Sequence, residues 1–210
     1  MPHYQLTYLD LRARGEPIRM MFAIAGVEFE DVRIPVSEWK DNLKDTPFLA
    51  LPMIEVNGLR FGQSLAILRY LAKEFGLAGP DNLTCAVADS FCDQYADFMN
   101  EWKNWHYCNQ GYTEGDKDDL YEKEFVPARN KHLPFFEEAL RQSSTGWIIN
   151  TPEVTHADLF IAASIESTMR VVPNHEGFLE GFPLIQAHQK KFFAHPKLQK
   201  HLAERPPVHY

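Results

Sequence analysis

The chain has 210 residues, of which 45% are hydrophobic, and its formal net charge is −8. This length suits one large or two small domains with a proper core, and the acidic balance argues against nucleic acid and anionic membranes as partners, since both attract a basic face. No apolar run approaches the length of a membrane span, and the start, MPHYQLTYLD, lacks the layout of a signal peptide, so we expect a cytoplasmic globular protein.

The first part of the chain mixes the strand period with the helix period. Apolar and polar residues alternate over 4–8 and predict a strand. The stretch LRARGEPIRMMFAIAG predicts a helix, with Pro17 in its first turn and Gly26 just past its end. Residues 27–34, VEFEDVRI, predict a second strand. The order strand, helix, strand is that of a βαβ unit.

The next stretch predicts a hairpin and a helix. Two short strands, 53–56 and 59–61, flank Asn57-Gly58, which is the strongest short hairpin signal because both turn positions need a positive φ. A helical stripe of apolar residues then follows: Leu65, Leu68, Leu71, Ala72 and Phe75. The N-terminal part is therefore predicted to be a small α/β layer with the order β-α-β, then β-β-α.

After Gly79-Pro80 no strand signal is convincing, and we predict an all-helical domain. One long helix is expected from a stripe at helical spacing: Val87, Phe91, Tyr95, Phe98, Trp102 and Trp105. A second helix around 133–140 is expected to be broken or kinked near Pro127 and Pro134. Three more are predicted, over 157–169, 184–193 and 197–203. The expected domains are 1–79 and 82–210.

One helix start is especially well specified. Thr155 and Asp158 match a capping box, as the N-cap and the third helical residue, with Val154 and Leu159 at the positions of a hydrophobic staple. An acidic residue in this place resembles a catalytic acid. Because a capping box satisfies helix amides reciprocally, we interpret Asp158 as structural.

Pro52 stands where an interior strand should begin, although proline cannot donate to a sheet ladder. Either it lies at an edge or its peptide bond is cis. Both leave the backbone of Leu51 unpaired, so that it can pair with an extended peptide. At Gln63-Ser64 a helix opens, where free amides attract an anion and the Ser64 hydroxyl adds a donor. A short peptide with a free carboxylate fits both features; the alternative is that Ser64 is a plain N-cap.

This arrangement resembles the cytosolic glutathione transferases, most closely the sigma class, which includes many helminth enzymes and the haematopoietic prostaglandin D synthases. The resemblance covers nearly the whole chain and is carried by the stretches YQLTYLDLRARGEPIR, EWK, LPMIEVNG, FGQSLAILRYLAKEFGLAG, DQYADF and THADL. It implies an α/β thioredoxin-like N-terminal domain and an all-α C-terminal domain. It also implies glutathione as co-substrate, a hydrophobic electrophile as second substrate, a role in detoxification and a homodimer.

The resemblance assigns the chemistry to two residues. Tyr8 matches the catalytic tyrosine of the family, and Arg14 matches an arginine that supports the tyrosine and the thiolate. The physical task is to ionise a thiol, because a free thiol with a pKa of roughly 8.5 is only a few per cent thiolate at neutral pH. A phenol that donates a hydrogen bond to the sulfur favours the anion.

The resemblance assigns glutathione binding to further residues. Trp39 and Lys44 would contact the glycyl end, and Leu51, before Pro52, would pair its backbone with the cysteinyl unit. Gln63 and Ser64 would hold the γ-glutamyl carboxylate. Asp97 would reach the γ-glutamyl ammonium of the neighbouring subunit.

Several positions depart from the family pattern. Leu49 and Ala50 replace a glycine and a Gln or Lys, which predicts weaker glutathione affinity. No metal is expected, because Ala96 interrupts the three acids that form a divalent-metal site in vertebrate prostaglandin D synthases. Asp89, Asp93 and Asp97 are spaced by four and repel one another unless a cation answers them.

The electrophile is expected between the two domains, where apolar pockets tend to form. Candidates for its wall, which can equally be core residues, are Leu9, Phe98, Trp102 and Trp105.

Four other functions compete. The run 62–66 is one residue from the G-x-S-x-G elbow of hydrolases, but that fold needs a longer parallel sheet. A thioredoxin-type redox role lacks its cysteines: Cys85, Cys92 and Cys108 form no C-x-x-C pair, and we interpret them as small side chains of a helix. A non-catalytic ligand carrier or crystallin-like relative remains an alternative, as does a glutathione-dependent prostaglandin isomerase.

Overall fold

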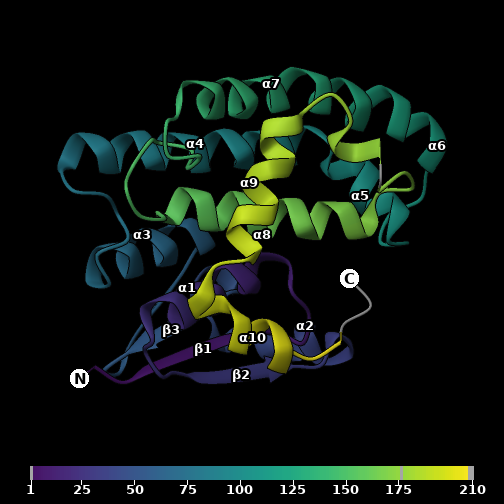
Figure 1. Ribbon diagram of the computed structural model, residues 1–210. Coiled ribbons are helices and arrows are strands. Elements are labelled where there is room, and N and C mark those ends of the chain that lie inside the picture. The colour runs from purple at the N-terminus through teal and green to yellow at the C-terminus, as the bar shows by residue number, and fades with distance from the viewer. Residues whose placement is uncertain (1, 176, 208–210) are drawn as a thin grey trace.

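A computed structural model describes residues 2–175 and 177–207. An α/β layer formed by the N-terminal part lies against a body of helices formed by the rest (Figure 1). The layer contains the strands β1 (Tyr4–Leu9), β2 (Glu30–Ile34), β3 (Met53–Val56) and β4 (Leu59–Gly62) and the helices α1 (Glu16–Ala25), α2 (Trp39–Asn42) and α3 (Ser64–Glu74).

The strand order of the sheet is β2-β1-β3-β4. β1 is parallel to β2 and antiparallel to β3, and β3 is antiparallel to β4. Asn57 and Gly58 both have positive φ, of 50° and 88°, as the hairpin prediction required. Gly26, with φ of 68°, ends α1 in the left-handed region. The βαβ unit and the hairpin followed by a helix are thus confirmed.

The second part of the chain contains helices joined by loops and no strand among its described residues, as predicted. Its α-helices are α4 (Asn82–Glu101), α5 (Lys103–Asn109), α6 (Lys117–Leu120), α7 (Val126–Gln142), α8 (His156–Val171), α9 (Pro183–Phe193) and α10 (Gln199–Glu204). This is the predicted class, an α/β layer followed by an all-α body. The expected boundary between domains at 79–82 stays a prediction. Within the described residues, none of the helices is both long enough and apolar enough to cross a membrane.

Two helix predictions differ from the structure in detail. The stripe expected on one long helix belongs to two, because the backbone leaves the helical region at Trp102, with φ −111° and ψ 16°, between α4 and α5. Trp102 and Trp105 nevertheless pack together in the core, with ring centroids 5.7 Å apart, whereas Val87 at the start of the stripe is 40% exposed. The second concerns the predicted breaks at proline. α7 is unbroken at Pro134, which lies inside it, but near Pro127 the pattern does change, because a π-helical segment, Tyr121–Phe125, ends just before the first turn of α7.

The apolar core is one cluster that extends through both parts of the molecule. Its members include Tyr4 of β1, Phe22 of α1, Phe136 of α7, Phe160 of α8 and Leu198 just before α10. α1 of the layer is in direct contact with α8 of the helical body. The α/β layer and the helical body therefore share one core. The three cysteines are free; burial raises the pKa of the Cys92 thiol, which agrees with a packing role.

The capping box at the start of α8 is confirmed. The Asp158 carboxylate accepts hydrogen bonds from the backbone N–H and the hydroxyl of Thr155, at 3.0 Å and 2.8 Å. It also accepts from the N–H of Ile148 at 2.7 Å, and its Oδ1 lies 3.0 Å from Nε2 of the buried His188. Asp158 is fully buried, so these contacts, and not catalysis, account for its place.

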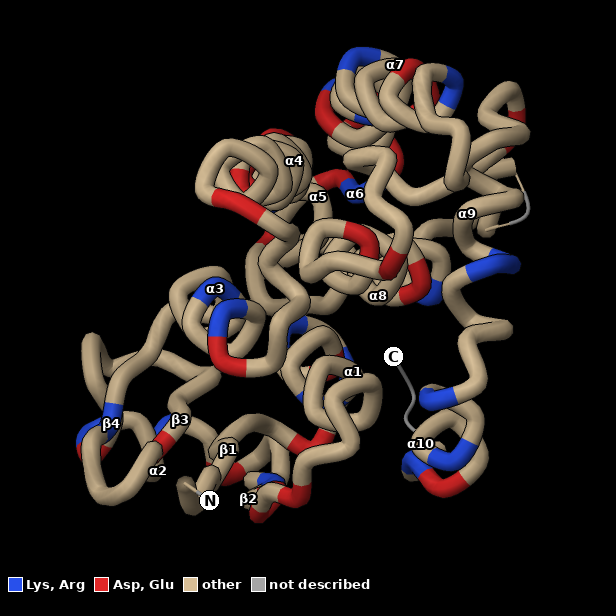
Figure 2. The backbone as a smooth tube through the Cα atoms, turned by 60° about the vertical axis from the view of Figure 1, so that its left-hand side comes forward, with Lys and Arg blue, Asp and Glu red and all other residues tan. Residues whose placement is uncertain are grey.

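A second ionic cluster joins the end of the chain to the α/β layer. Figures 1 and 2 show α10 beside α1 and the sheet, away from the other helices of the body. Glu16 of α1 is 1% exposed, and its Oε1 lies 2.9 Å from Nε2 of His201 and 3.0 Å from Arg205. Burial alone would raise the pKa of Glu16, but the hydrogen bonds and charges of His201 and Arg205 lower it to about 2.

This cluster predicts a pH-dependent term in stability. An ordinary glutamate has a pKa of 4.5, so the folded-state pKa of about 2 is the lower one. The contribution of Glu16 is therefore complete above pH 4.5 and is lost as the pH falls towards 2. In urea unfolding, the native chain should lose up to roughly 3 kcal/mol more than Glu16→Gln over this window. Equal losses in the two chains would contradict this account.

Candidate active site

The strand register brings the predicted residues to one end of the sheet. Thr7 pairs with Met53, and Met53 pairs with Gly62. The next residue along β1 is Tyr8, the one before Met53 is Pro52, and the one after Gly62 is Gln63. Three segments far apart in sequence thus meet at this end. In the part of the chain that the structure describes, only one strand pair, β1 and β2, is parallel, which excludes the hydrolase interpretation.

The Leu51–Pro52 peptide bond is cis. β3, which follows it, lies between β1 and β4, so the cis explanation is confirmed and the edge explanation is wrong. Pro52 is buried and Leu51 is half-buried. The carbonyl oxygen of Pro52 lies 3.5 Å from where a Cβ on Gly62 would be, which shows how closely this turn approaches the start of α3.

The alternative that Ser64 is a plain N-cap of α3 is wrong. Ser64 is the first helical residue, and the N-cap is Gln63, whose φ of 73° is positive and whose side chain makes no capping hydrogen bond. The Ser64 side chain is 9% exposed, and its hydroxyl has no hydrogen bond with any described residue. The hydroxyl and the first amides of α3 therefore remain available to an anion.

Tyr8 is almost fully buried, with 6% of its surface exposed. Its hydroxyl accepts a hydrogen bond from the backbone N–H of Arg14 at 3.2 Å. Burial raises the pKa of the phenol above its ordinary value, although the Arg14 N–H and the charges of Arg14 and Arg19 oppose the shift. The phenol is thus protonated at neutral pH, and because it accepts from Arg14, its own proton is free to be donated.

Two residues that sequence patterns did not indicate hold Tyr8. A Cβ on Gly15 would lie 2.3 Å from Cδ1 of the Tyr8 ring, so only glycine admits the ring at this place. On α1, the guanidinium carbon of Arg19 lies 5.8 Å from the centre of the same ring. Neither contact follows from spacing along the chain, because both depend on how α1 packs against β1.

Gly15→Ala is expected to lower the free energy of unfolding by about 1–3 kcal/mol, because the new methyl overpacks a rigid ring. Gly62→Ala is the matched control: its Cβ would meet nothing closer than 3.5 Å. Urea unfolding measures both changes. A Gly15→Ala chain as stable as the control would show that the ring moves aside freely.

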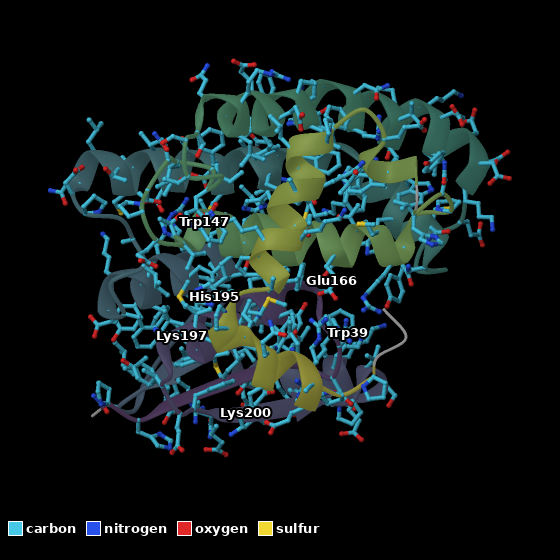
Figure 3. All side chains as sticks on the ribbon, in the orientation of Figure 1. Trp39, Trp147, Glu166, His195, Lys197 and Lys200 are labelled. Carbon is cyan, nitrogen blue, oxygen red and sulfur yellow. The ribbon has the colours of Figure 1, made fainter. Side chains whose placement is uncertain are left out.

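Trp39 and Lys44 follow β2 in the chain. Because β2 is parallel to β1, it ends at the same end of the sheet as Tyr8. Trp39 begins α2 and is 39% exposed, and Lys44 is exposed. In Figure 3 Trp39 projects from α2 at the end of the sheet away from the N-terminus. The Arg14 side chain is also exposed.

Asp97 lies apart from these residues, on α4. A cation neutralises part of the row of acids Asp89, Asp93 and Asp97, but not at Asp97. Arg69 of α3 pairs with Asp89 at 3.1 Å and with Asp93. Asp97 is exposed and has no ion pair with a described residue. It lines a hollow of about 470 Å³ with Gln94, Asn100, Glu101, Lys131, His132 and Phe135. Among the described residues, no group of three His, Cys, Asp or Glu side chains is placed to hold a metal ion.

Three of the four residues suggested as the electrophile wall belong to the core. Phe98, Trp102 and Trp105 are at most 5% exposed, which makes the wall interpretation wrong for them. Two exposed tyrosines offer a different wall. The rings of Tyr107 and Tyr112 lie 6.3 Å apart, and Tyr112 is near enough to Tyr8 for its charge to raise the pKa of that phenol. They were missed because they lie off the helical stripe.

A thioredoxin-like α/β layer followed by an all-helical body is the fold of glutathione S-transferases. The family model described as "Glutathione S-transferase, N-terminal domain" matches residues 4–73, and the one described as "Glutathione S-transferase, C-terminal domain" matches residues 96–205. The chain belongs to the glutathione S-transferase family and is an enzyme of this type.

Relatives from nematodes are similar over the whole length. Glutathione S-transferase 1 of Ascaris suum is 41% identical, and the match covers 100% of both chains. The solved glutathione S-transferase of Ascaris lumbricoides has a TM-score of 0.91 and 39% identity, with 99% of this chain and 100% of that chain covered. A Nu-class enzyme from Haemonchus contortus has a TM-score of 0.87 and 37% identity, with 100% of both chains covered.

Proposed function

We propose that this enzyme conjugates glutathione to hydrophobic electrophiles and that Tyr8 activates the thiol. The observation that carries the proposal is the state of Tyr8. Its hydroxyl accepts the Arg14 N–H, and its raised pKa keeps its own proton on the phenol. A protonated phenol with a free donor direction stabilises a thiolate by a hydrogen bond, and each unit of thiol pKa lowering corresponds to about 1.4 kcal/mol.

The proposal gives glutathione a position along the end of the sheet. Its cysteinyl backbone pairs with the backbone of Leu51, and its γ-glutamyl carboxylate takes the Ser64 hydroxyl and the first amides of α3. Support comes from the register, which brings these segments to the same end of the sheet as Tyr8, and from the Ser64 hydroxyl, which has no hydrogen bond with a described residue. Trp39 and Lys44 take the glycyl end.

The chemistry is a nucleophilic displacement or addition. The thiol proton passes to solvent, and the sulfur, held by the Tyr8 hydrogen bond, forms a bond to the electrophilic carbon. In a displacement the leaving group departs with the electron pair of the broken bond. Tyr107 and Tyr112 supply an apolar face with polar tips for the electrophile.

Three finer assignments belong to the same proposal. We assign the chain to the sigma class on the motifs quoted above, although the Haemonchus contortus relative is described as Nu-class. We propose a cytoplasmic homodimer in which Asp97, free of ion pairs with described residues, serves the γ-glutamyl ammonium of the partner subunit. Detoxification is the corresponding role.

The test combines calorimetric glutathione binding with turnover of chlorodinitrobenzene, in the native chain and in Ser64→Ala. We expect turnover in the native chain and a loss of glutathione affinity of about tenfold in the variant, since one hydrogen bond to a charged group is removed. Failure of the native chain to bind glutathione would mean that the presence of Leu49 and Ala50 has abolished the peptide-binding site. The non-catalytic ligand-carrier interpretation would then replace ours.

A further inference from the structure

The end of the chain is anchored on the α/β layer. Leu198, just before α10, is fully buried in the common core. From there α10 lies beside α1 and the sheet (Figures 1 and 2). His201 and Arg205 point back to the layer, where both contact Glu16. Arg205 also pairs with Glu166 of α8, at 2.6 Å, so it bridges a carboxylate of the layer and one of the helical body.

Glu16 also contacts Arg19, which lies one turn further along α1. The carboxylate lies 3.7 Å from the Arg19 guanidinium, and both side chains are 1% exposed. On its other side, Arg19 donates through Nε to Asp31 of β2, at 3.1 Å and 3.0 Å. Two carboxylates therefore fix the plane of one buried guanidinium.

The same guanidinium holds the segment that carries Tyr8. It donates to the carbonyl of Leu9, the last residue of β1, at 3.5 Å and to that of Leu11, in the turn that follows, at 2.8 Å. Its carbon lies 5.8 Å from the centre of the Tyr8 ring. Arg19 thus contacts both the ring and the backbone that follows it.

We propose that Glu16, Arg19, His201 and Arg205 form a positioning strap, by which the C-terminal segment sets the orientation of the Tyr8 phenol. None of the four is a catalytic residue; each acts through the next. Apolar packing would stabilise the same place at least as well, since buried ion pairs seldom gain net stability. What a fixed guanidinium adds is geometry, because its five donors lie in one rigid plane. This inference rests on the proposed function of Tyr8.

The test is a double-mutant cycle of Arg205→Met and Tyr8→Phe, with turnover, glutathione affinity and the ultraviolet absorbance of bound thiolate as readouts. In Arg205→Met, Glu16 keeps His201 and Arg19 as partners. We expect kcat to fall by about fivefold to tenfold with glutathione affinity within twofold, because a misplaced group costs rate more than binding. The thiolate absorbance should fall with kcat. In the Tyr8→Phe background Arg205→Met should change neither.

Lys200→Met is the matched control on α10. Lys200, labelled in Figure 3, is exposed and makes no hydrogen bond or ion pair with a described residue. It should keep the native rate. If Arg205→Met fails to fold, Arg205→Lys carries the test, because lysine keeps the charge but cannot bridge two carboxylates in one plane. A smaller fall in the same direction is then expected.

Two outcomes would overturn the strap, and they are distinguishable. If Arg205→Met lowers kcat equally with tyrosine and with phenylalanine at position 8, its effect is on the fold in general, and the strap fails while the proposed function stands. If Tyr8→Phe itself keeps the native rate and thiolate signal, the proposed role of Tyr8 fails, and the strap falls with it.

Discussion

Tyr8→Phe is expected to lower kcat/KM for glutathione conjugation by about a hundredfold, the usual cost of removing one donor aimed at a developing or resident anion. The phenol is buried and keeps its proton at neutral pH, and its oxygen already accepts a hydrogen bond from the Arg14 N–H. Phenylalanine keeps the ring packed on Gly15 but removes the proton that the thiolate needs.

Glutathione binding should change little in this variant, because the proposed contacts of the peptide lie on other residues. Calorimetry therefore separates activation from binding. Tyr4→Phe is the control, since Tyr4 lies on the same strand with its ring in the core and is 3% exposed. A Tyr8→Phe chain that turns over as fast as Tyr4→Phe would remove the phenol from the mechanism.

Asp158→Ala is expected to lower the free energy of unfolding by about 3–5 kcal/mol, the range for breaking a buried, fully paired charge site. The carboxylate accepts hydrogen bonds from Ile148 and Thr155 and lies 3.0 Å from Nε2 of His188, and neither the Asp158 nor the His188 side chain has exposed surface. Its removal leaves several buried donors without an acceptor. Urea unfolding at neutral pH measures the change.

Glu153→Ala provides the comparison for Asp158→Ala, because Glu153 is an exposed acid in the loop just before α8. It should alter stability by about 0.5 kcal/mol or less. Burial alone would raise the pKa of Asp158, but His188 and the backbone N–H groups of Ile148 and Thr155 lower it. Its contribution is therefore present at neutral pH and lost in acid. Similar midpoints for Asp158→Ala and Glu153→Ala would contradict the structural role.

Local signals in the sequence predicted most of the fold. The Asn57-Gly58 turn and the capping box at Thr155 and Asp158 are set by a few neighbouring residues, and both are as expected. The aromatic stripe through Trp102 indicated which side chains are buried, but not that the helix is interrupted at Trp102. Periodicity describes side-chain placement, and a short interruption that preserves the buried face leaves the pattern intact.

The site was predictable only where one segment carries its own signal. Pro52 and the helix start at Gln63-Ser64 are local anomalies that can be recognised in the sequence, and the family resemblance indicated Tyr8 as a candidate. Gly15 and Arg19 were missed because their contacts with Tyr8 depend on the packing of α1 on β1. The aromatic candidates were ranked by spacing, which favoured core residues over the exposed Tyr112.

The core that passes without interruption from β1 through α1 and α8 to Leu198 limits how this enzyme can diverge. Neither the α/β layer nor the helical body has a finished apolar surface of its own. A change of volume on one side of the α1–α8 contact must be matched on the other, because close-packed cores tolerate neither voids nor crowding. The two parts therefore evolve as a pair, and new electrophile preferences are most readily acquired at exposed positions such as Tyr107 and Tyr112, outside that shared interior.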